Sequence, residues 1–256
     1  MNEKIEKPDK SREFGLGTWI SIGTPVITEL ASEFMFDWLL FDLEHGCVQE
    51  SSLLSNFQAV SRKELKLIVR VGSLDPALIA RVLDWGATGI MMPHVTSGDQ
   101  AVACLNAMRY PPFGKRGFSG SARVYNYGLS RPQDLNKIPL PRFMAQIEDA
   151  EGVKNAEEIA SVEGVDVLFV GPSDLKHELF THSEKETINF NDALKIVCKA
   201  AHNHDKQAGI LLQDTSNIKE LIKYGFSCFA ISSDLGIIKR GYQIIISESK
   251  KMFNNN

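Results

Sequence analysis

Short runs of apolar residues recur along the chain, and most of them show no alternation between apolar and polar positions. Such a run is typical of a strand that is buried on both faces, as in a parallel sheet. Polar, helix-like stretches separate the runs, so the pattern predicts repeated strand–helix units. The strands are expected at Leu16–Ile22, Trp38–Leu43, Leu67–Val71, Gly89–Pro93, Phe143–Glu148, Val165–Val170, Ala208–Leu212 and Cys228–Ile231.

The clearest helix runs from Asp75 to Gly86. Asp75 is a good N-cap, a proline follows at the first helical position, apolar residues recur at spacings of three and four, and Gly86 ends the helix. Helices are also predicted at Ser97–Arg109, Val153–Ser161, Phe190–His204, Ser216–Tyr224 and Ile237–Phe253.

About eight strand–helix pairs predict a closed α/β barrel of the (β/α)₈ type. The alternative is a doubly wound open sheet. It lacks support, because no G-x-G-x-x-G follows the first strand and Gly15-Leu-Gly17 precedes a strand instead of opening a helix.

The length fits one domain, since the chain has 256 residues and 43% of them are hydrophobic. A single barrel usually needs about 250 residues. We expect an N-terminal extension at 1–13, one barrel domain at 14–253 and a tail at 254–256. The segment from Tyr110 to Pro141 is rich in Pro, Gly and Ser and has no period. A loop this long is expected to lie over the catalytic face or to reach a neighbouring subunit.

Composition argues against several classes of partner. The net charge of −4, the pI of about 5.9 and the lack of a basic stripe predict no binding to nucleic acid. No apolar run approaches the roughly 18 to 20 residues that span a bilayer, and the charged N-terminus lacks a signal-like apolar stretch. We expect no membrane contact and a cytoplasmic location. Cys104, Cys198 and Cys228 are expected to be reduced packing residues, while Cys47 follows a candidate active-site turn.

In a barrel, active-site groups lie at the C-terminal ends of the strands. The fifth and sixth of these ends carry the carboxylates Glu148 and Asp174. With other positions left to water and substrate oxygens, such a pair suits Mg²⁺ or Mn²⁺. Either carboxylate alone is as well explained by a solvated loop, and Asp174 also suits the first turn of a helix. Further polar residues at predicted strand ends are Asp42, Glu44, His45, Arg70, His94, Gln146 and Ser173.

Arg70 and His45 have both a structural and a catalytic interpretation. A lone arginine at a strand end is more often part of an ion pair, but beside a metal it would stabilise an enolate oxygen. His45 is either a hydrogen-bonded turn residue or a general base. The segment Gly171–Asp174 opens a predicted helix whose free N–H groups would hold a small carboxylate. Together these groups suit a 2-oxo acid that reacts through an enolate.

These motifs resemble those of a known family, the HpcH/HpaI class II aldolases of the phosphoenolpyruvate/pyruvate-type barrels. The resemblance runs from about Gly15 to Arg240. It implies a barrel whose last helix is exchanged between subunits, commonly in a hexamer built as a trimer of dimers, with a dimer as the smaller alternative. It also implies metal-dependent, reversible cleavage of 4-hydroxy-2-oxo acids to pyruvate and an aldehyde. The matching segments are Asp37–His45, Val69–Arg70, Arg109–Gly117, Gln146–Glu148 and Gly164–Leu175.

The resemblance assigns roles to individual residues. Glu148 and Asp174 match the metal ligands of the family, so the implied cofactor is a divalent cation, Mg²⁺ or Mn²⁺. Gln146 and Ser173 match positions that contact the pyruvate moiety, and Asp174 also borders the substrate.

Three further matches concern acid–base chemistry and the enolate. His45 matches the catalytic base, and Arg70 matches the residue that stabilises the enolate. Asp84 matches the acid that raises the basicity of the histidine; without the resemblance it is a polar residue at the end of its helix. His94 departs from the family pattern, because many members carry an apolar residue there, and it is a candidate additional acid or base.

Three functions therefore compete. The first is a 2-oxo acid aldolase. The second is a relative that condenses acetyl-CoA with oxaloacetate, as in citrate formation associated with siderophore synthesis, with His94 beside His45 as the extra acid or base. The third is a barrel kept as a binding or scaffold protein, which is disfavoured because every matched catalytic position carries a competent residue.

Overall fold

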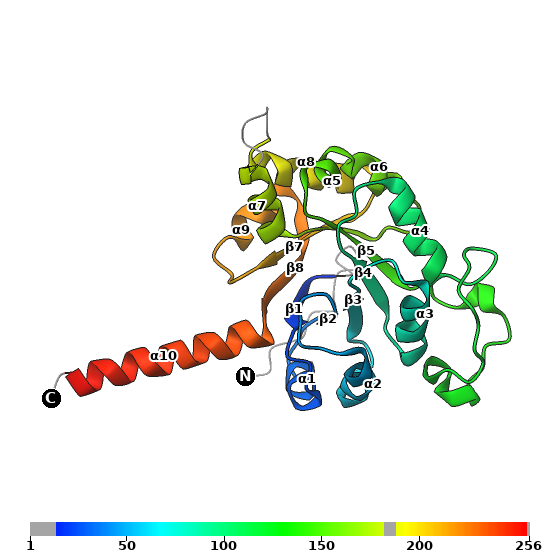
Figure 1. The fold of residues 1–256 in the computed structure, drawn as a ribbon, viewed down its shortest axis with the longest axis horizontal. Helices are drawn as coiled ribbons and strands as arrows, with labels where there is room; N and C mark the ends of the chain where they lie inside the picture. The colour runs from blue at the N-terminus through cyan, green and yellow to red at the C-terminus, as the bar shows by residue number, and fades with distance from the viewer. Residues whose placement is uncertain (1–13, 182–187, 255–256) are drawn as a thin grey trace, which may run out of the picture.

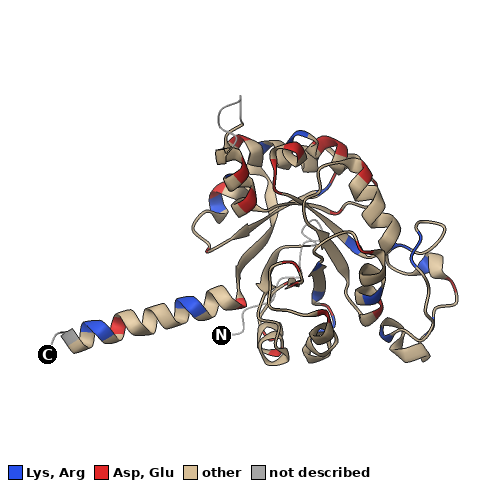
Figure 2. Cartoon of the chain, in the orientation of Figure 1, with Lys and Arg blue, Asp and Glu red and all other residues tan. Residues whose placement is uncertain are grey.

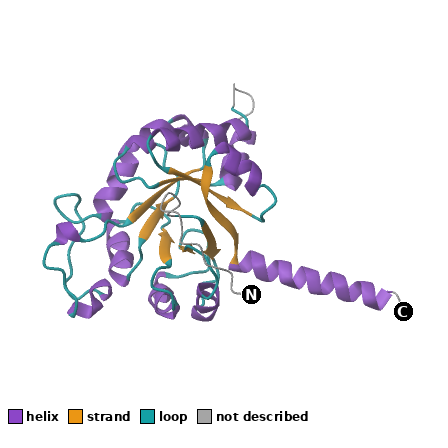
Figure 3. Cartoon of the chain, turned by 180° about the vertical axis from the view of Figure 1, so that it is seen from behind, coloured by secondary structure: helices purple, strands orange, loops and turns teal. Residues whose placement is uncertain are grey.

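The computed structural model describes residues 14–181 and 188–254. Its eight strands form one closed parallel barrel in chain order, surrounded by helices (Figures 1 and 3). The predicted (β/α)₈ barrel is therefore confirmed over the open sheet, whereas the expected N-terminal extension at 1–13 and residues 255–256 of the tail lie outside the described residues. The strands are β1 (Leu16–Ile20), β2 (Trp38–Asp42), β3 (Lys66–Arg70), β4 (Gly89–Met92), β5 (Arg142–Ile147), β6 (Val167–Val170), β7 (Gln207–Leu212) and β8 (Phe226–Ser233).

Helices occur at the predicted positions, with one difference, and two further helices, at Pro25–Ser32 and Glu50–Ala59, had no predicted bounds. The single helix expected at Val153–Ser161 is two short helices, because Asn155 leaves the helical conformation with φ −95° and ψ 11°. The helices are α1 (Pro25–Ser32), α2 (Glu50–Ala59), α3 (Pro76–Trp85), α4 (Gly98–Met108), α5 (Ala150–Lys154), α6 (Ala156–Ser161), α7 (Pro172–Thr181), α8 (Phe190–Asn203), α9 (Ile218–Tyr224) and α10 (Asp234–Asn254), with 3₁₀ turns η1 (Arg123–Gly128) and η2 (Leu135–Lys137).

Helix α3 shows how local sequence sets its ends. The side chain of Asp75 accepts the N–H groups of Ala77 (2.9 Å) and Leu78 (3.2 Å). Gly86 ends the helix in the left-handed region with φ 111°, a conformation that glycine adopts without a steric penalty. Both boundaries agree with the sequence prediction.

Strand residues point alternately into the barrel and toward the helices. On β2, Trp38 and Leu40 belong to the cluster inside the barrel, whereas Leu39 and Phe41 pack in the layer between strands and helices. The next inward position is Asp42, at the C-terminal end of the strand. The two-residue period therefore carries polar side chains to the mouth of the barrel without breaking its apolar interior.

The barrel interior is filled by side chains. Trp19 lies against Phe169 with ring centroids 5.6 Å apart, and Trp38 meets the same ring at 6.0 Å. The polar layer at the C-terminal ends of the strands thus rests on packed aromatic rings.

The long segment between α4 and β5 does not cover the catalytic face of its own barrel. It starts after α4 has returned the chain to the N-terminal side of the strands, so the prediction of a loop over the catalytic face is wrong. It lies beside α3, where Arg123 donates to the carbonyl oxygen of Trp85 at 2.6 Å. Contact with a neighbouring subunit stays a prediction.

Helix α10 extends away from the barrel (Figure 1). Its first residue, Asp234, is buried and accepts the N–H groups of Ser21 (2.9 Å) and Ile22 (3.0 Å), which joins α10 to the end of β1. Apolar side chains exposed along the helix are Leu235, Ile237, Tyr242, Ile244, Ile245, Ile246, Met252 and Phe253.

Two findings concern the predicted absence of membrane and nucleic-acid partners. None of the helices in the described ranges is long and apolar enough to span a bilayer. Lys and Arg residues are spread over several elements, including α10 and the segment beside α3 (Figure 2). Absence of nucleic-acid binding and a cytoplasmic location remain predictions.

The four cysteines are unpaired, as expected. Burial raises the pKa of both Cys104 and Cys198 to about 12, so these thiols are unreactive packing groups. Cys228 is also buried, whereas Cys47 is exposed after the turn that carries His45.

Candidate active site

Polar side chains form one buried layer at the C-terminal mouth of the barrel. Asp42 and Arg70 are register partners on the neighbouring strands β2 and β3. Gln146 lies on β5, and Glu148 follows two residues later on the same inward-facing side. All four residues are at most 7% exposed. The structure therefore brings together Arg70, Gln146 and Glu148, which the sequence singled out, and adds Asp42.

Asp42 fixes both Arg70 and the turn that carries His45. Its two carboxylate oxygens accept hydrogen bonds from Nε (2.9 Å) and Nη2 (2.8 Å) of Arg70. Oδ1 also accepts the backbone N–H groups of Glu44 (3.1 Å) and His45 (3.2 Å). Sequence reasoning placed Asp42 at a strand end without a role. The inward period of β2 and its register with Arg70 are the signals that reveal one.

Glu44 is a second carboxylate beside Arg70 that had no assigned role. Its Oε2 lies 2.9 Å from Nη1 of Arg70 and 3.8 Å from Nε2 of His45, and its Oε1 lies 3.8 Å from Nε2 of His94. The guanidinium also lies 5.5 Å from the ring centroid of Trp19. Arg70 is thus held by two carboxylates and an aromatic face.

Glu148 lies at the centre of the layer. Its Oε1 accepts the backbone N–H of His94 at 2.9 Å and lies 3.2 Å from Nδ1 of the same residue, while its Oε2 accepts the amide of Gln146. Burial raises the pKa of Glu148, and the hydrogen bond from the His94 backbone acts in the opposite direction. An ionised carboxylate here is therefore costly without a cation.

His94 has a restrained position above Glu148. Its φ of 50° lies in the left-handed region, which is unusual for a residue other than glycine. The adjacent Val95 N–H donates to the carbonyl oxygen of Gln146, so this turn is tied to β5. The side chain is 60% exposed. The candidate additional acid or base thus lies in the site itself.

The raised pKa of Glu148 leads to a stability prediction. Folding raises this pKa, so the buried charge does not destabilise the protein in acid, below the ordinary pKa of a glutamate. The destabilisation grows as the pH rises through the raised pKa and is complete above it. The variant Glu148→Gln keeps an acceptor for the His94 N–H and removes the charge. It should raise the free energy of unfolding of the metal-free protein by on the order of 1 kcal/mol at neutral pH. Urea unfolding of both proteins across a pH series measures this difference, and a gain that persists unchanged in acid would contradict a charge effect.

Ser173 and Asp174 lie in the first turn of α7, and both are exposed. The negative charge of Asp174 is close enough to Glu148 to contribute to the raised pKa of that residue. Gly171 precedes them. A side-chain carbon on this glycine would lie 2.4 Å from Oε2 of Glu148 and 2.8 Å from Nε2 of Gln146. The glycine therefore leaves the space that the carboxylate and amide occupy.

These residues fit a divalent cation with hard oxygen ligands. Within residues 14–181 and 188–254, no group of three or more His, Cys, Asp or Glu side chains converges as a metal site. The two carboxylates Glu148 and Asp174 therefore remain the protein ligands in question, with other positions left to water and substrate. The Oε1 atom of Gln146 is buried and has no hydrogen-bond partner among these residues, so it is free to accept a hydrogen bond from a bound molecule.

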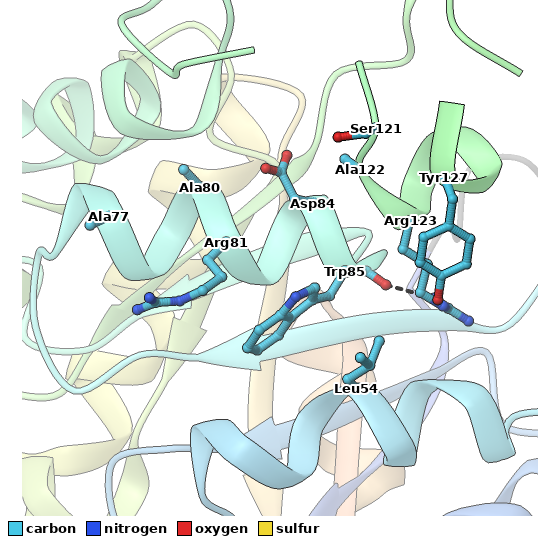
Figure 4. A pocket seen from close by; sticks show the side chains of 10 residues that line it. All are labelled: Leu54, Ala77, Ala80, Arg81, Asp84, Trp85, Ser121, Ala122, Arg123 and Tyr127. Atoms are coloured by element: carbon cyan, nitrogen blue, oxygen red, sulfur yellow. Dashed lines mark hydrogen bonds between the residues drawn. The ribbon is translucent and has the colours of Figure 1, made fainter. Parts of the chain in front are cut away.

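Asp84 and His45 do not meet within one chain. In the described chain the ion-pair partner of Asp84 is Arg116, whereas His45 is 67% exposed and lies beside Glu44. Asp84 is in the last turn of α3, which runs away from the mouth of the barrel. It lines an outer cavity of about 410 Å³ together with Trp85 (Figure 4). Its role as partner of His45 stays a prediction that one chain cannot satisfy.

Comparison with known proteins gives the family. Residues 16–240 match the HpcH/HpaI aldolase/citrate lyase family. The chain is 32% identical to a 5-keto-4-deoxy-D-glucarate aldolase of Klebsiella pneumoniae over 236 residues, which is 92% of each chain. Its structure resembles that of an HpcH/HpaI aldolase/citrate lyase family protein from Burkholderia cenocepacia, with a TM-score of 0.84, 28% identity and coverage of 94% of this chain and 97% of the other.

A second solved structure is similar over nearly the same length. Citrate synthase SbnG superposes with a TM-score of 0.78 at 25% identity, covering 94% of this chain and 95% of that one. The sequence match, the closed barrel and the polar layer at its mouth lead to the same assignment. The chain belongs to the HpcH/HpaI aldolase/citrate lyase family and is a carbon–carbon lyase of the aldolase type.

Proposed function

We propose that the enzyme catalyses the divalent-metal-dependent, reversible cleavage of a 4-hydroxy-2-oxo acid to pyruvate and an aldehyde. The observation that carries this proposal is the polar layer at the mouth of the barrel, in which Arg70 and His45 both lie beside Glu44 and burial raises the pKa of Glu148. A cation site, an oxyanion-binding guanidinium and an exposed imidazole are the three groups that enolate chemistry needs.

Each group has a distinct task in the proposed reaction. A Mg²⁺ or Mn²⁺ ion held by Glu148 and Asp174 would supply Lewis-acid polarisation of the 2-oxo acid. His45 takes the proton of the C4 hydroxyl, the C3–C4 bond breaks, and its electron pair remains on pyruvate as the enolate while the aldehyde leaves. Arg70 holds the enolate oxygen, and return of the proton from His45 to C3 gives pyruvate.

The carboxylate of the 2-oxo acid is expected at the start of α7. Pro172 has no N–H, but the N–H groups of Ser173 and Asp174 belong to the unpaired first turn, where helix ends attract anions. Gln146 borders the same space through the glycine at position 171. This arrangement supports the assignment of Ser173 and Gln146 to the pyruvate moiety.

A second function is favoured by a specific feature. His94 lies 3.2 Å from Glu148, and SbnG, a citrate synthase, has a similar structure. In that alternative, His94 is the additional acid or base for condensing acetyl-CoA with oxaloacetate. The third alternative, a scaffold without turnover, disagrees with the family assignment and leaves the buried charges at the mouth unexplained.

One coupled assay separates these functions. The protein, loaded with Mg²⁺ or Mn²⁺, is incubated with 5-keto-4-deoxy-D-glucarate, and separately with oxaloacetate in the presence or absence of acetyl-CoA, while pyruvate and free thiol are followed. Pyruvate release without thiol supports the aldolase. Thiol release that needs both oxaloacetate and acetyl-CoA supports the condensing enzyme, and silence in all mixtures contradicts both.

We also propose that the enzyme is a homo-oligomer in which α10 packs on another subunit. The exposed apolar side chains of α10 and of the region around α1, including Val26, Leu30, Phe34 and Met35, are the surfaces that such contacts would bury. A second subunit would also offer a partner for His45 that Asp84 does not provide in its own chain. Light scattering of the full-length protein tests this, and a monomeric mass would contradict it.

A further inference from the structure

Two carboxylates hold Arg70 in different ways. Asp42 accepts aligned hydrogen bonds from Nε and Nη2 at 2.9 and 2.8 Å. Oε2 of Glu44 lies as close to Nη1, at 2.9 Å, but this oxygen is buried and takes part in no aligned hydrogen bond within the described residues. Asp42 is therefore the fixed partner of the guanidinium, whereas the contact with Glu44 is a charge pair without hydrogen-bond geometry.

Glu44 is also placed so that it can move. Its side chain is 11% exposed, whereas that of Asp42 is 4% exposed. The Nε2 atoms of His45 and His94 lie 3.8 Å from its two oxygens, Oε2 and Oε1 respectively. A carboxylate that leaves Nη1 would therefore remain within reach of the two imidazoles.

The proposed reaction places a new negative charge at the end of Arg70 that Glu44 occupies. Asp42 takes the edge formed by Nε and Nη2, so an oxyanion must approach from the Nη1 end. With Asp42 and Glu44 both ionised, the three side chains sum to one negative charge. An incoming oxyanion thus competes with Glu44 for the same donor group.

We propose that Glu44 is a positioning residue that holds Nη1 of Arg70 in the free enzyme and is displaced by the oxyanion of the substrate. This inference rests on the proposed function, because it takes the displacing group to be a 2-oxo acid or its enolate. The displaced carboxylate then orients the two histidines at the mouth of the site, where acid–base chemistry is needed.

This role predicts opposite effects on anion binding and on turnover. Removing the charge of Glu44 removes the competitor for Nη1, so a small planar dianion should bind more tightly. The same change removes the carboxylate that orients the two histidines after displacement, so kcat should fall. A residue that merely supports the fold would weaken binding and turnover together.

Oxalate is a suitable probe, because it resembles the enolate of pyruvate in shape and charge. Calorimetric titration of oxalate into the Mg²⁺-loaded protein should give a Kd about tenfold lower for Glu44→Gln than for the wild type. Asp42→Asn should bind oxalate more weakly, since the fixed partner of Arg70 is lost. Glu50→Gln is the matched control: Glu50 pairs with Arg81 at 2.6 Å on the outer helices α2 and α3, and its loss should leave the Kd unchanged.

Steady-state kinetics supply the second readout. For Glu44→Gln, both KM and kcat for the 2-oxo acid should fall, whereas a structural role predicts a higher KM. Equal or weaker oxalate binding by a folded Glu44→Gln variant overturns the proposal, and Glu44→Ala repeats the test without the amide. If neither variant folds, Glu44 has a structural role and the proposal is wrong.

The test of Glu44 can be distinguished from the test of the proposed aldolase reaction. Oxalate affinity is measured without turnover, so tighter binding by Glu44→Gln supports the displacement even if the wild type releases no pyruvate from any 2-oxo acid. Pyruvate release by the wild type with unchanged oxalate binding in Glu44→Gln supports the aldolase and rejects the role of Glu44.

Discussion

Glu148→Gln and Asp174→Asn should each lower metal-dependent pyruvate release by roughly 10³-fold or more. Lewis-acid stabilisation is worth several kcal/mol of transition-state free energy, and each variant removes one of the two carboxylates proposed to hold the ion. Glu148 should show the larger loss, because its buried side chain has hydrogen bonds to both His94 and Gln146 that fix its direction.

The measurement pairs activity with Mg²⁺ or Mn²⁺ titration by calorimetry. Both variants should lose metal affinity along with activity, and chelation followed by addition of metal should restore the wild type alone. Asp192→Asn is the matched control, since Asp192 is also a first-turn acid, in α8, but lies outside the site and pairs with Lys195. Full activity of the Glu148 and Asp174 variants after chelation would remove the metal from the mechanism.

His45→Ala should reduce turnover by about 10² to 10⁴-fold, the usual contribution of a general acid–base residue. Metal affinity should stay nearly the same, because the imidazole ring is exposed and the backbone N–H of His45 donates to Asp42 and not to Glu148. Comparison of kcat and of the Mn²⁺ affinity of the same preparation tests both parts.

His204→Ala is the control for this second prediction. His204 lies 3.0 Å from Glu157 on the outer layer of helices, so its loss should affect neither quantity. If His45→Ala loses metal binding together with activity, His45 supports the cation site and is not the base.

Local sequence was sufficient for most elements of the barrel. Continuous apolar runs gave the eight strands, and the cap formed by Asp75 with Gly86 at the other end gave α3 to the residue. These strands and helix ends depend on a few neighbouring residues, so they can be predicted without knowledge of the tertiary contacts. The Val153–Ser161 prediction failed because one residue, Asn155, leaves the helical conformation between two short helices.

Only part of the candidate site could be predicted from the local sequence. Arg70, Gln146 and Glu148 could be found as polar residues at the ends of apolar runs, and the structure brings them into one layer. Asp42 and Glu44 were visible as residues but not as partners of Arg70, because their contacts depend on the register between β2 and β3.

Long-range placement separated residues that the resemblance had joined. Asp84 matches the acid that raises the basicity of His45, yet within one chain α3 carries it away from the mouth of the barrel to Arg116, so its pairing with His45 stays a prediction. The long segment before β5 was expected over the catalytic face or at a neighbouring subunit. It begins after α4 and so lies on the other side of the barrel, and the contact with a neighbouring subunit stays a prediction.

The sequence by itself determined the barrel, its element order and the residue types available for enolate chemistry, because apolar periodicity and helix caps act over short distances. Only the tertiary structure decided that Arg70 is shared by Asp42 and Glu44, that His94 is restrained above Glu148, and that Asp84 and His45 do not meet in one chain. The physical reason is that strand register and barrel closure place residues far apart in sequence within about 3 Å of each other, the range over which hydrogen bonds and buried charges act.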